Sequence, residues 1–98
     1  MAYRVYISDY ALRDLEAIHE YISSELKSPR TSKKLTNELI NEIYSLDEFP
    51  NRYPYHRSRK FKDLRKMVVK NYLVFYRVNE KDKSVMVYRI VYSRKDIR

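Results

Sequence analysis

Apolar residues recur every three or four positions through most of the N-terminal half, and this spacing constrains the fold more than any other feature of the chain. Such a period places one apolar stripe along a helix. From residue 11 to about residue 26 the stripe consists of Leu12, Leu15, Ile18, Ile22 and Leu26. A second stripe, over about 29–48, consists of Leu35, Leu39, Ile43 and Leu46. The sequence therefore predicts two amphipathic helices that share one packing surface.

Residues that favour helix ends mark the bounds of both stripes. Ser8 and Asp9 offer side-chain oxygens to the free N–H groups of the first helix. Ser28 is expected to cap the second helix, with Pro29 at its first position, where no N–H is needed. Pro50 is expected to end it. The short break between the stripes predicts a helical hairpin.

Strand-like segments flank the two helices. Residues 3–8 alternate between apolar and polar types, and 64–70, 72–78 and 85–92 are three further candidates. The last two are joined by a polar turn and predict an antiparallel hairpin. The order β-α-α-β-β-β predicts an α+β fold, with the two-helix hairpin packed on one face of a small, mainly antiparallel sheet. With 98 residues, we expect one domain spanning 1–98.

The chain contains neither glycine nor cysteine. Without glycine, we expect turns to use the prolines and Asn51, Asn71 and Asn79, because asparagine tolerates positive φ better than most residues. The same absence excludes nucleotide cofactors held by a P-loop or a Rossmann turn. The lack of cysteine excludes disulfides and thiolate chemistry, and it suits a reducing cytoplasm.

The histidines and carboxylates offer little for metal or acid–base chemistry. A metal site needs three or four converging ligands. We interpret His19, near Glu16 and Glu20, as a residue of the helix surface, and His56 as a surface contact in a basic loop. The carboxylates belong to the polar faces of the helices, where solvation and ion pairs account for them. We therefore expect no metal, no cofactor, no Ser-His-Asp relay and no two-carboxylate mechanism.

Membrane and export signals are also missing from the sequence. The N-terminal residues 1–6 lack the apolar stretch of a secretory signal. The longest apolar run, 72–76, is far shorter than the roughly 20 residues of a membrane-spanning helix. We therefore expect a cytoplasmic protein without a membrane partner.

Positive charge is concentrated in the C-terminal half. Residues 1–50 carry a net charge of −3 and residues 51–98 one of +11, which implies one strongly positive surface. A solvated face without a partner, a polyanionic target and an acidic protein partner would each account for it. Arginine clamps phosphates, and exposed aromatic rings stack on bases. The candidate target-binding residues are Arg57, Arg59, Lys60, Lys62, Arg65, Lys66, Lys70, Arg94, Lys95 and Arg98.

Arginine and tyrosine side chains could also cleave a phosphodiester without a metal, because arginine stabilises the developing charge while tyrosine or lysine moves a proton. The candidates for this chemistry are Arg65, Arg77, Arg89, Tyr92 and Arg94. Arg77 and Arg89 each interrupt an apolar stripe, where a charge is costly unless it is paired or faces an open surface. Each is either half of an ion pair, for example with a helix carboxylate, or exposed on a functional sheet face. We interpret most of the eleven tyrosines as strand residues that pack the core.

Three segments carry a family pattern in the same order. Residues 10–22 fit Ala-x-x-Asp-Leu-x-x-Ile-x-x-Tyr-Ile, the opening helix of ParE-type toxins. Leu64-Arg65 followed by 71–78 is similar to a Leu-Arg … Tyr-x-(apolar)-x-Tyr-Arg-Val strand, and 85–96 to a last strand closed by Arg-Arg-Asp, here Arg94-Lys95-Asp96. Nearly the whole chain thus resembles the RelE/ParE superfamily, the toxins of bacterial toxin–antitoxin pairs.

The resemblance implies an antitoxin partner, acidic or amphipathic, that folds on binding, and one of two targets. RelE-like members cut mRNA in the ribosomal A site, whereas ParE-like members poison DNA gyrase and have lost the nuclease residues. Leu73 stands where RelE- and YoeB-like nucleases carry arginine, Tyr92 stands where YoeB-like enzymes carry histidine, and the C-terminal tyrosine of RelE enzymes has no clear counterpart. Arg65 and Arg94 match basic positions of the family and suit either activity.

These departures favour a ParE-like gyrase inhibitor, with a RelE-like ribosome-dependent mRNA endonuclease as the alternative. The chain is an enzyme only under the second interpretation. The basic half alone would also allow a third function, a non-catalytic nucleic-acid-binding module.

Overall fold

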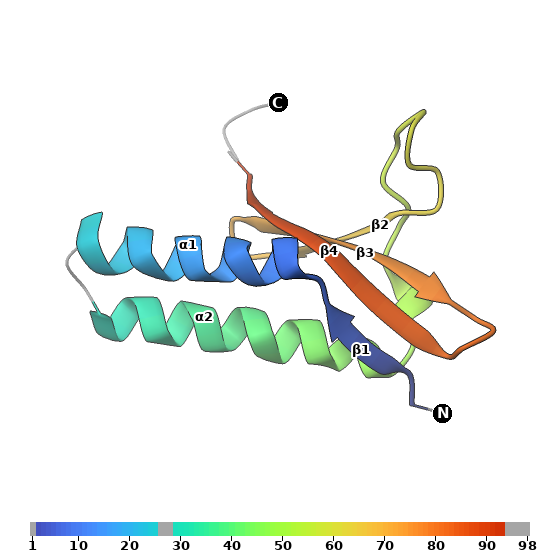
Figure 1. Ribbon diagram of the computed structural model, residues 1–98, viewed down its shortest axis with the longest axis horizontal. Coiled ribbons are helices and arrows are strands. Elements are labelled where there is room, and N and C mark those ends of the chain that lie inside the picture. Colours follow the sequence, from blue (N-terminus) through green and yellow to red (C-terminus); the bar gives the residue numbers. More distant parts are fainter. Residues whose placement is uncertain (1, 26–28, 94–98) are drawn as a thin grey trace.

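A hairpin of two helices lies against one face of a four-stranded sheet (Figure 1). The computed structural model describes residues 2–25 and 29–93. In chain order the elements are β1 (Arg4–Ile7), α1 (Asp9–Glu25), α2 (Pro29–Tyr44), the 3₁₀ turns η1 (Ser45–Asp47) and η2 (Pro50–Arg52), β2 (Arg65–Val69), β3 (Tyr72–Asn79) and β4 (Ser84–Tyr92). This order confirms the predicted α+β arrangement.

The sheet is mixed, with the order β1-β4-β3-β2. The pairs β2–β3 and β3–β4 are antiparallel, which confirms the predicted hairpin of the last two strands. β1 pairs in parallel with β4, so Arg4 lies opposite Ser84. The first and last strands of the chain are therefore neighbours, and β4 lies inside the sheet.

The core lies between the helices and the sheet. Its fully buried members include Leu39 and Ile43 of α2 and Val74, Val85 and Val87 of the sheet. The predicted stripes are confirmed in large part, but the prediction that Leu12 belongs to the buried stripe is wrong. Leu12 is 45% exposed, and Ala11 is fully buried in its place, because the stripe of α1 runs through 11, 15, 18 and 22. Leu26 and Ser28 lie outside the described residues.

The second helix is shorter than the sequence predicts. α2 ends at Tyr44 rather than near residue 48, and η1 continues the chain with Leu46 fully buried. Pro50 does not end the helix but begins η2. The Tyr76 hydroxyl donates a hydrogen bond of 2.6 Å to the Pro50 carbonyl, so β3 anchors this irregular segment from within the core.

The turns manage without glycine, and asparagine takes part in them as predicted, but not through positive φ. Asn71 lies in the turn between β2 and β3, whereas the residues with positive φ in the described chain are Phe49 (51°), Lys70 (55°) and Lys83 (54°). Asn79 supports its turn in another way, because its Oδ1 accepts a hydrogen bond from the N–H of Asp82. The left-handed conformation costs an ordinary residue roughly 1–2 kcal/mol, a cost that the surrounding packing has to offset at three places.

The interpretation of most tyrosines as core residues is also wrong. Tyr72 and Tyr76 are buried, and Tyr3 and Tyr53 pack partly against the core. The exposed tyrosines are Tyr6, Tyr10, Tyr21, Tyr44, Tyr55, Tyr88 and Tyr92. They lie on both helices, on the segment between η2 and β2 and on the sheet, so the surface of the protein is rich in aromatic rings. None of the described helices is long and apolar enough to cross a membrane.

Because of Tyr76, the free energy of unfolding should decrease as the pH rises through the alkaline range. Burial raises the pKa of its hydroxyl from 10.0 to about 12. Because the folded protein holds this proton more tightly than the unfolded chain, the stabilisation is fully present below pH 10 and is lost as pH rises through about 12. Chemical denaturation at pH 8 to 12 should show this loss. Tyr76→Phe should be less stable at pH 8 by about 1 kcal/mol and should lack this component of the alkaline loss. Tyr10→Phe, at an exposed ring, should keep it.

Candidate functional site

A β-bulge in β4 decides which side chains face the side of the sheet away from the helices, here named the open face. Phe75 lies opposite Arg89, but Tyr76 lies opposite Val87, so Tyr88 is an extra residue in β4. A bulge of one residue moves all later side chains to the other face. Val87 is therefore buried, whereas Arg89 lies on the open face. The sequence interpretation, in which Arg89 shares one stripe with Val85, Val87 and Val91, overlooked this shift.

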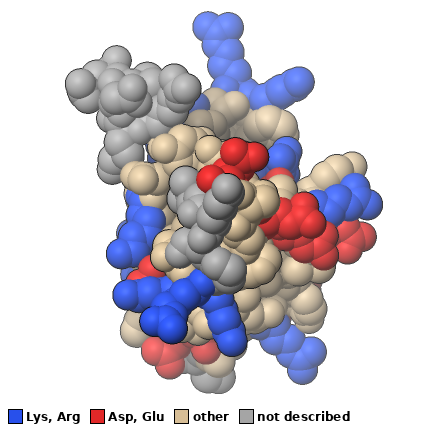
Figure 2. All heavy atoms as spheres, turned by 90° about the vertical axis from the view of Figure 1, so that its left-hand side faces the viewer, with Lys and Arg blue, Asp and Glu red and all other residues tan. Residues whose placement is uncertain are grey.

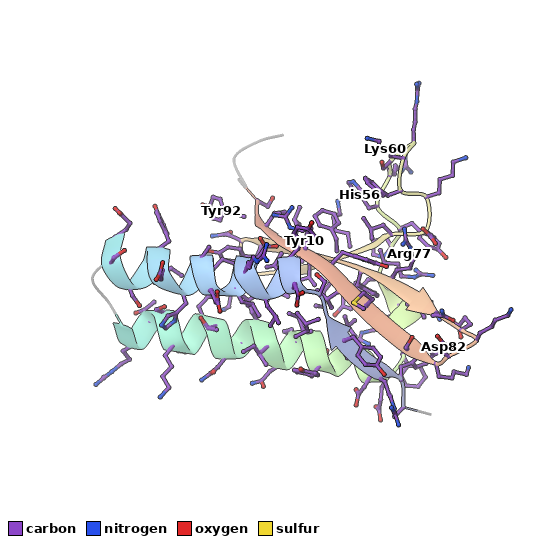
Figure 3. All side chains as sticks on the ribbon, in the orientation of Figure 1. Tyr10, His56, Lys60, Arg77, Asp82 and Tyr92 are labelled. Carbon is purple, nitrogen blue, oxygen red and sulfur yellow. The ribbon has the colours of Figure 1, made fainter. Side chains whose placement is uncertain are left out.

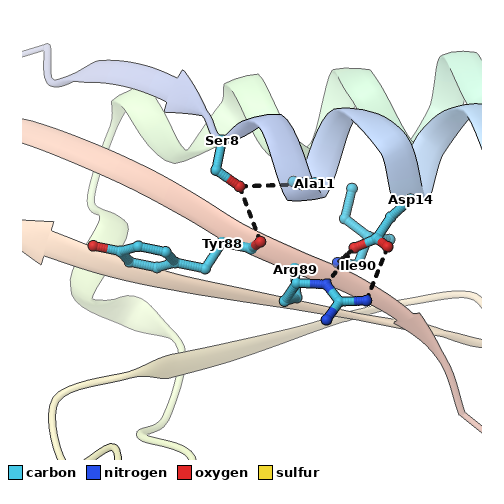
Figure 4. A network of polar contacts seen from close by, with 6 residues as sticks. All are labelled: Ser8, Ala11, Asp14, Tyr88, Arg89 and Ile90. Atoms are coloured by element: carbon cyan, nitrogen blue, oxygen red, sulfur yellow. Dashed lines mark hydrogen bonds and ion pairs between the residues drawn. The ribbon is translucent and has the colours of Figure 1, made fainter.

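The start of α1 satisfies the polar groups of the bulge (Figure 4). The Ser8 hydroxyl donates to the Tyr88 carbonyl at 3.0 Å and accepts from the Ala11 N–H at 3.1 Å, so it caps the helix as predicted and contacts the bulge. Asp14 Oδ2 accepts from the Ile90 N–H at 2.8 Å. The bulge is therefore bonded to the helix at two points.

Arg89 completes this network. Its Nε donates to Asp14 Oδ2 at 2.8 Å and its second terminal nitrogen donates to Oδ1 at 3.0 Å, a bidentate pair. These hydrogen bonds and the charge of Asp14 raise the pKa of the guanidinium. Arg89 is thus paired with a helix carboxylate and also exposed on the open face, which combines the two alternatives left by the sequence.

Arg77 lies beside Arg89 on the open face but has a partner from the loop. Its terminal nitrogens bond Asp63 at 2.9 Å and the Tyr88 hydroxyl at 3.3 Å, and its guanidinium lies 5.2 Å from the centre of the Tyr88 ring. Burial alone would lower the pKa of Arg77, but the bonds to Asp63 and Tyr88 raise it overall. Its Nε is buried and bonds to none of the described residues.

Both arginines line a pocket of about 400 Å³ between the open face and the loop of residues 56–64. The loop supplies His56, Phe61 and Leu64 to this pocket. The His56 ring packs edge-on against Phe75 at 5.0 Å, so His56 is half-buried rather than a plain surface contact. The strands supply the remaining lining residues, Phe75, Arg77, Tyr88, Arg89 and Val91. The pocket is mainly apolar, with two cations at its rim.

The other candidates for metal-free chemistry lie elsewhere. Arg65 donates to the carbonyls of Asn51 and Tyr53, and its guanidinium lies 3.9 Å from the centre of the Tyr55 ring, so it holds the chain before the loop in place. Tyr92, 61% exposed, packs edge-on against Tyr72 at 5.5 Å and lines a groove beside the helices. Arg94 lies outside the described residues. The four described candidates therefore do not form one cluster.

The loop carries the group of positive charges that the sequence predicts. Arg57, Arg59, Lys60 and Lys62 are exposed on it, and no ion pair between described residues involves any of them. In Figure 3 Lys60 extends from the outer end of the loop, away from the sheet. In Figure 2, the view from the free end of the helical hairpin, Lys and Arg side chains project beyond the rest of the surface at the top, the level of this loop in Figure 1.

The remaining predicted target-binding residues are spread more widely. Lys66 is half-buried on the open face of β2, beside Phe75 of β3. Lys70 lies in the turn after β2, with its ammonium 4.0 Å from a Glu38 oxygen. Lys95 and Arg98 lie outside the described residues. The loop is therefore the part of the list that the fold brings together.

Sequence reasoning missed the two carboxylates that hold the arginines. The sequence prediction places the helix carboxylates, Asp14 among them, on the polar faces of the helices, yet the Asp14 side chain is only 16% exposed. The helix pattern quoted above includes this aspartate, which was a usable signal. Asp63 sits in a basic segment and gave no such signal. His19 lies on the helix surface as predicted, with Nδ1 2.8 Å from the Ser32 hydroxyl oxygen.

Within residues 2–25 and 29–93, no three His, Asp or Glu side chains come together in a way that could hold a metal ion. What the site offers is a positive rim, an apolar floor and a protruding basic loop. Such a surface attracts anionic partners.

Comparison with known proteins identifies one family. A sequence model described as ParE toxin of the parDE type II toxin–antitoxin system matches residues 5–97. No curated protein sequence matches significantly.

Solved structures share the fold at low sequence identity. A chain of the chromosomal ParDE toxin–antitoxin system from P. aeruginosa is 18% identical, with a TM-score of 0.79, over 95% of this chain and 98% of that one. A chain of the RelBE2 toxin–antitoxin complex from Mycobacterium tuberculosis is 18% identical, with a TM-score of 0.75, over 98% and 95%. The isolated E. coli RelE toxin is 17% identical, with a TM-score of 0.64, over 98% and 89%. At these identities the likeness establishes the fold alone.

The Asp14 network yields a stability prediction. Asp14→Ala removes the acceptor of the Ile90 N–H and should lower the free energy of unfolding by about 1–3 kcal/mol. Asp14→Asn keeps an acceptor oxygen and should lose less. Arg89→Met should also lose less, because Asp14 then still accepts from Ile90. Urea denaturation at pH 7 measures all three. Glu16→Ala, on the exposed side of α1, is the control, and a loss for Asp14→Ala no larger than for this control would contradict the proposed role.

Proposed function

This chain belongs to the ParE toxin family of type II toxin–antitoxin systems, and we propose that it arrests bacterial growth in the cytoplasm by inhibiting DNA gyrase. The observation that carries this proposal is the state of the candidate nuclease residues. Arg77 and Arg89 are each paired with a carboxylate, Arg65 holds backbone carbonyls, and Tyr92 lies beside the helices. A metal-free nuclease needs such groups free and convergent on one phosphate.

The position of Leu73 supports the same choice. Leu73 lies on β3 in the row of Val68 and Val91, and all three belong to the open face. An arginine at this position would point toward the pocket side of the sheet, but leucine cannot bind phosphate. Loss of one preorganised stabilising group typically slows catalysis by about 10²–10³.

The basic loop is the part of the surface that we assign to partner recognition. Its four exposed cations form no ion pair with another described residue, and such charges speed association and select between partners. We propose that a cognate antitoxin covers this loop and the open face with an acidic segment that folds on binding. The same cations would serve the engagement of gyrase once the antitoxin is removed.

The alternative, a ribosome-dependent mRNA endonuclease, keeps one observation in its favour. Arg77, Arg89 and His56 line the same pocket, so two cations and an imidazole lie within one small region of the open face. Rearrangement of the two ion pairs on a ribosome would be needed before either arginine could meet a phosphate.

One pair of assays distinguishes the two targets. Purified protein should inhibit supercoiling by gyrase or trap cleaved DNA, and it should leave mRNA intact on programmed ribosomes. Cleavage of ribosome-bound mRNA at the A site would show that the gyrase assignment is wrong. Replacing Arg65, Arg77, Arg89 and Arg94 one at a time would then identify the residue responsible.

The loop provides a second test of the proposal. Expression of the chain alone should arrest growth, and a neighbouring antitoxin should relieve the arrest. Neutralising Arg57, Arg59, Lys60 and Lys62 to glutamine should weaken the arrest and slow antitoxin association, with a smaller dependence of the on-rate on salt. The control neutralises an equal number of exposed helix cations, Arg13, Arg30, Lys33 and Lys34. Equal effects of the two variants would show that net charge, rather than the loop, is what matters.

A further inference from the structure

We propose that the pocket beneath the loop of residues 56–64 binds one large apolar side chain of an acidic peptide segment, whose carboxylates meet the two arginines at the pocket rim. Assigning that segment to the antitoxin rests on the proposed function. The preference of the pocket for an apolar side chain is independent of the proposed function, because it can be measured on the purified chain.

The lining of the pocket favours an apolar occupant. Four of its eight lining residues are Phe61, Leu64, Phe75 and Val91, and Phe61 is 48% exposed although it is a large apolar residue. A volume of about 400 Å³ lies in the range of pockets that hold small ligands, roughly 300–1,000 Å³. A mainly apolar lining with a few polar groups is usual in pockets that bind small ligands or single side chains.

The rim favours carboxylates. Both arginines already bind a carboxylate, Arg77 with one terminal nitrogen on Asp63 and Arg89 with two nitrogens on Asp14. Asp63 is an exchangeable partner, since its side chain is 66% exposed and it belongs to the loop. A carboxylate from a peptide can therefore replace or join Asp63 at Arg77.

A nucleic acid fits the same pocket less well. A nucleobase would bury its polar edge against an apolar lining, which is costly without hydrogen-bond partners. Phosphates can reach the cations of the loop, Arg57, Arg59, Lys60 and Lys62, without any part of the nucleic acid entering the pocket. An acidic peptide uses both parts, because its apolar side chain fills the pocket and its remaining carboxylates reach the loop.

The test uses three probes and the purified full chain. The probes are a fluorescent twelve-residue peptide of glutamate and aspartate with one central phenylalanine, the same peptide with alanine at the centre, and a single-stranded oligonucleotide of equal charge. Binding is measured by anisotropy up to millimolar peptide. We expect the phenylalanine peptide to bind about tenfold more tightly than the alanine peptide, as burial of a large apolar side chain predicts. This comparison requires no change in the protein.

Two matched variants locate the binding. Val91→Phe fills the pocket and should abolish the difference between the two peptides. Val68→Phe introduces the same ring on the same face, but Val68 is on β2 and does not line the pocket, so it should preserve the difference. Thermal unfolding confirms that both variants are folded. Asp63→Asn removes the competing carboxylate and should tighten binding of the phenylalanine peptide severalfold.

Several outcomes would overturn the proposal. These are equal binding of the two peptides, binding too weak to detect, or a difference that survives Val91→Phe. An oligonucleotide that binds more tightly than the phenylalanine peptide, and only without Val91→Phe, would assign the pocket to nucleic acid. None of these outcomes bears on growth arrest by the expressed chain, which is the readout of the proposed function, so the two can fail separately.

Discussion

The contact between the N-terminal part of α1 and the bulge in β4 is the interaction on which the open face depends. The bulge turns Arg89 away from the helices, and Ser8 and Asp14 bond the backbone groups that the bulge displaces. Without the extra residue, Arg89 would face the same side of the sheet as Val85 and Val87. Its charge would then lie in the core, where burial is costly. One irregularity in one strand thus keeps a guanidinium at the rim of a pocket, and one carboxylate holds it there.

The positive charges of the C-terminal half serve two different purposes. Arg52 and Arg65 bond backbone carbonyls before the loop, and Arg77 and Arg89 are tied to carboxylates, so these four support the fold as much as the surface. The cations of the loop have no such partners among the described residues and remain solvated. A net charge of +8 therefore overstates what is free to meet a partner, and the loop is where the free charge is concentrated.

Periodicity was sufficient to predict the two α-helices, the four strands and their order, because each of these elements has a characteristic spacing of apolar residues. It failed where tertiary packing decides. Ala11 replaces Leu12 in the core because the stripe is set by the approach of α1 to the sheet, and the left-handed residues are Phe49, Lys70 and Lys83 because turn geometry outweighs residue preference. At the site, the basic loop was predictable from composition. The pairing of Arg89 with Asp14 depends on a bulge, and the pairing of Arg77 with Asp63 depends on the fold of the loop. Local spacing records neither.

The parallel pairing of β1 with β4 has a consequence for how the protein is made. Arg4 and Ser84 are neighbours in the sheet although 80 positions separate them in the sequence, and β4 also pairs with β3 along its other edge. While the chain is being synthesised, β1 lacks its pairing strand and the apolar sides of both helices remain exposed until β4 is available to complete the core. Contacts so distant in sequence form late and slowly. The sheet can therefore close only after β4 has been synthesised, and until then the growing chain has no complete open face to present.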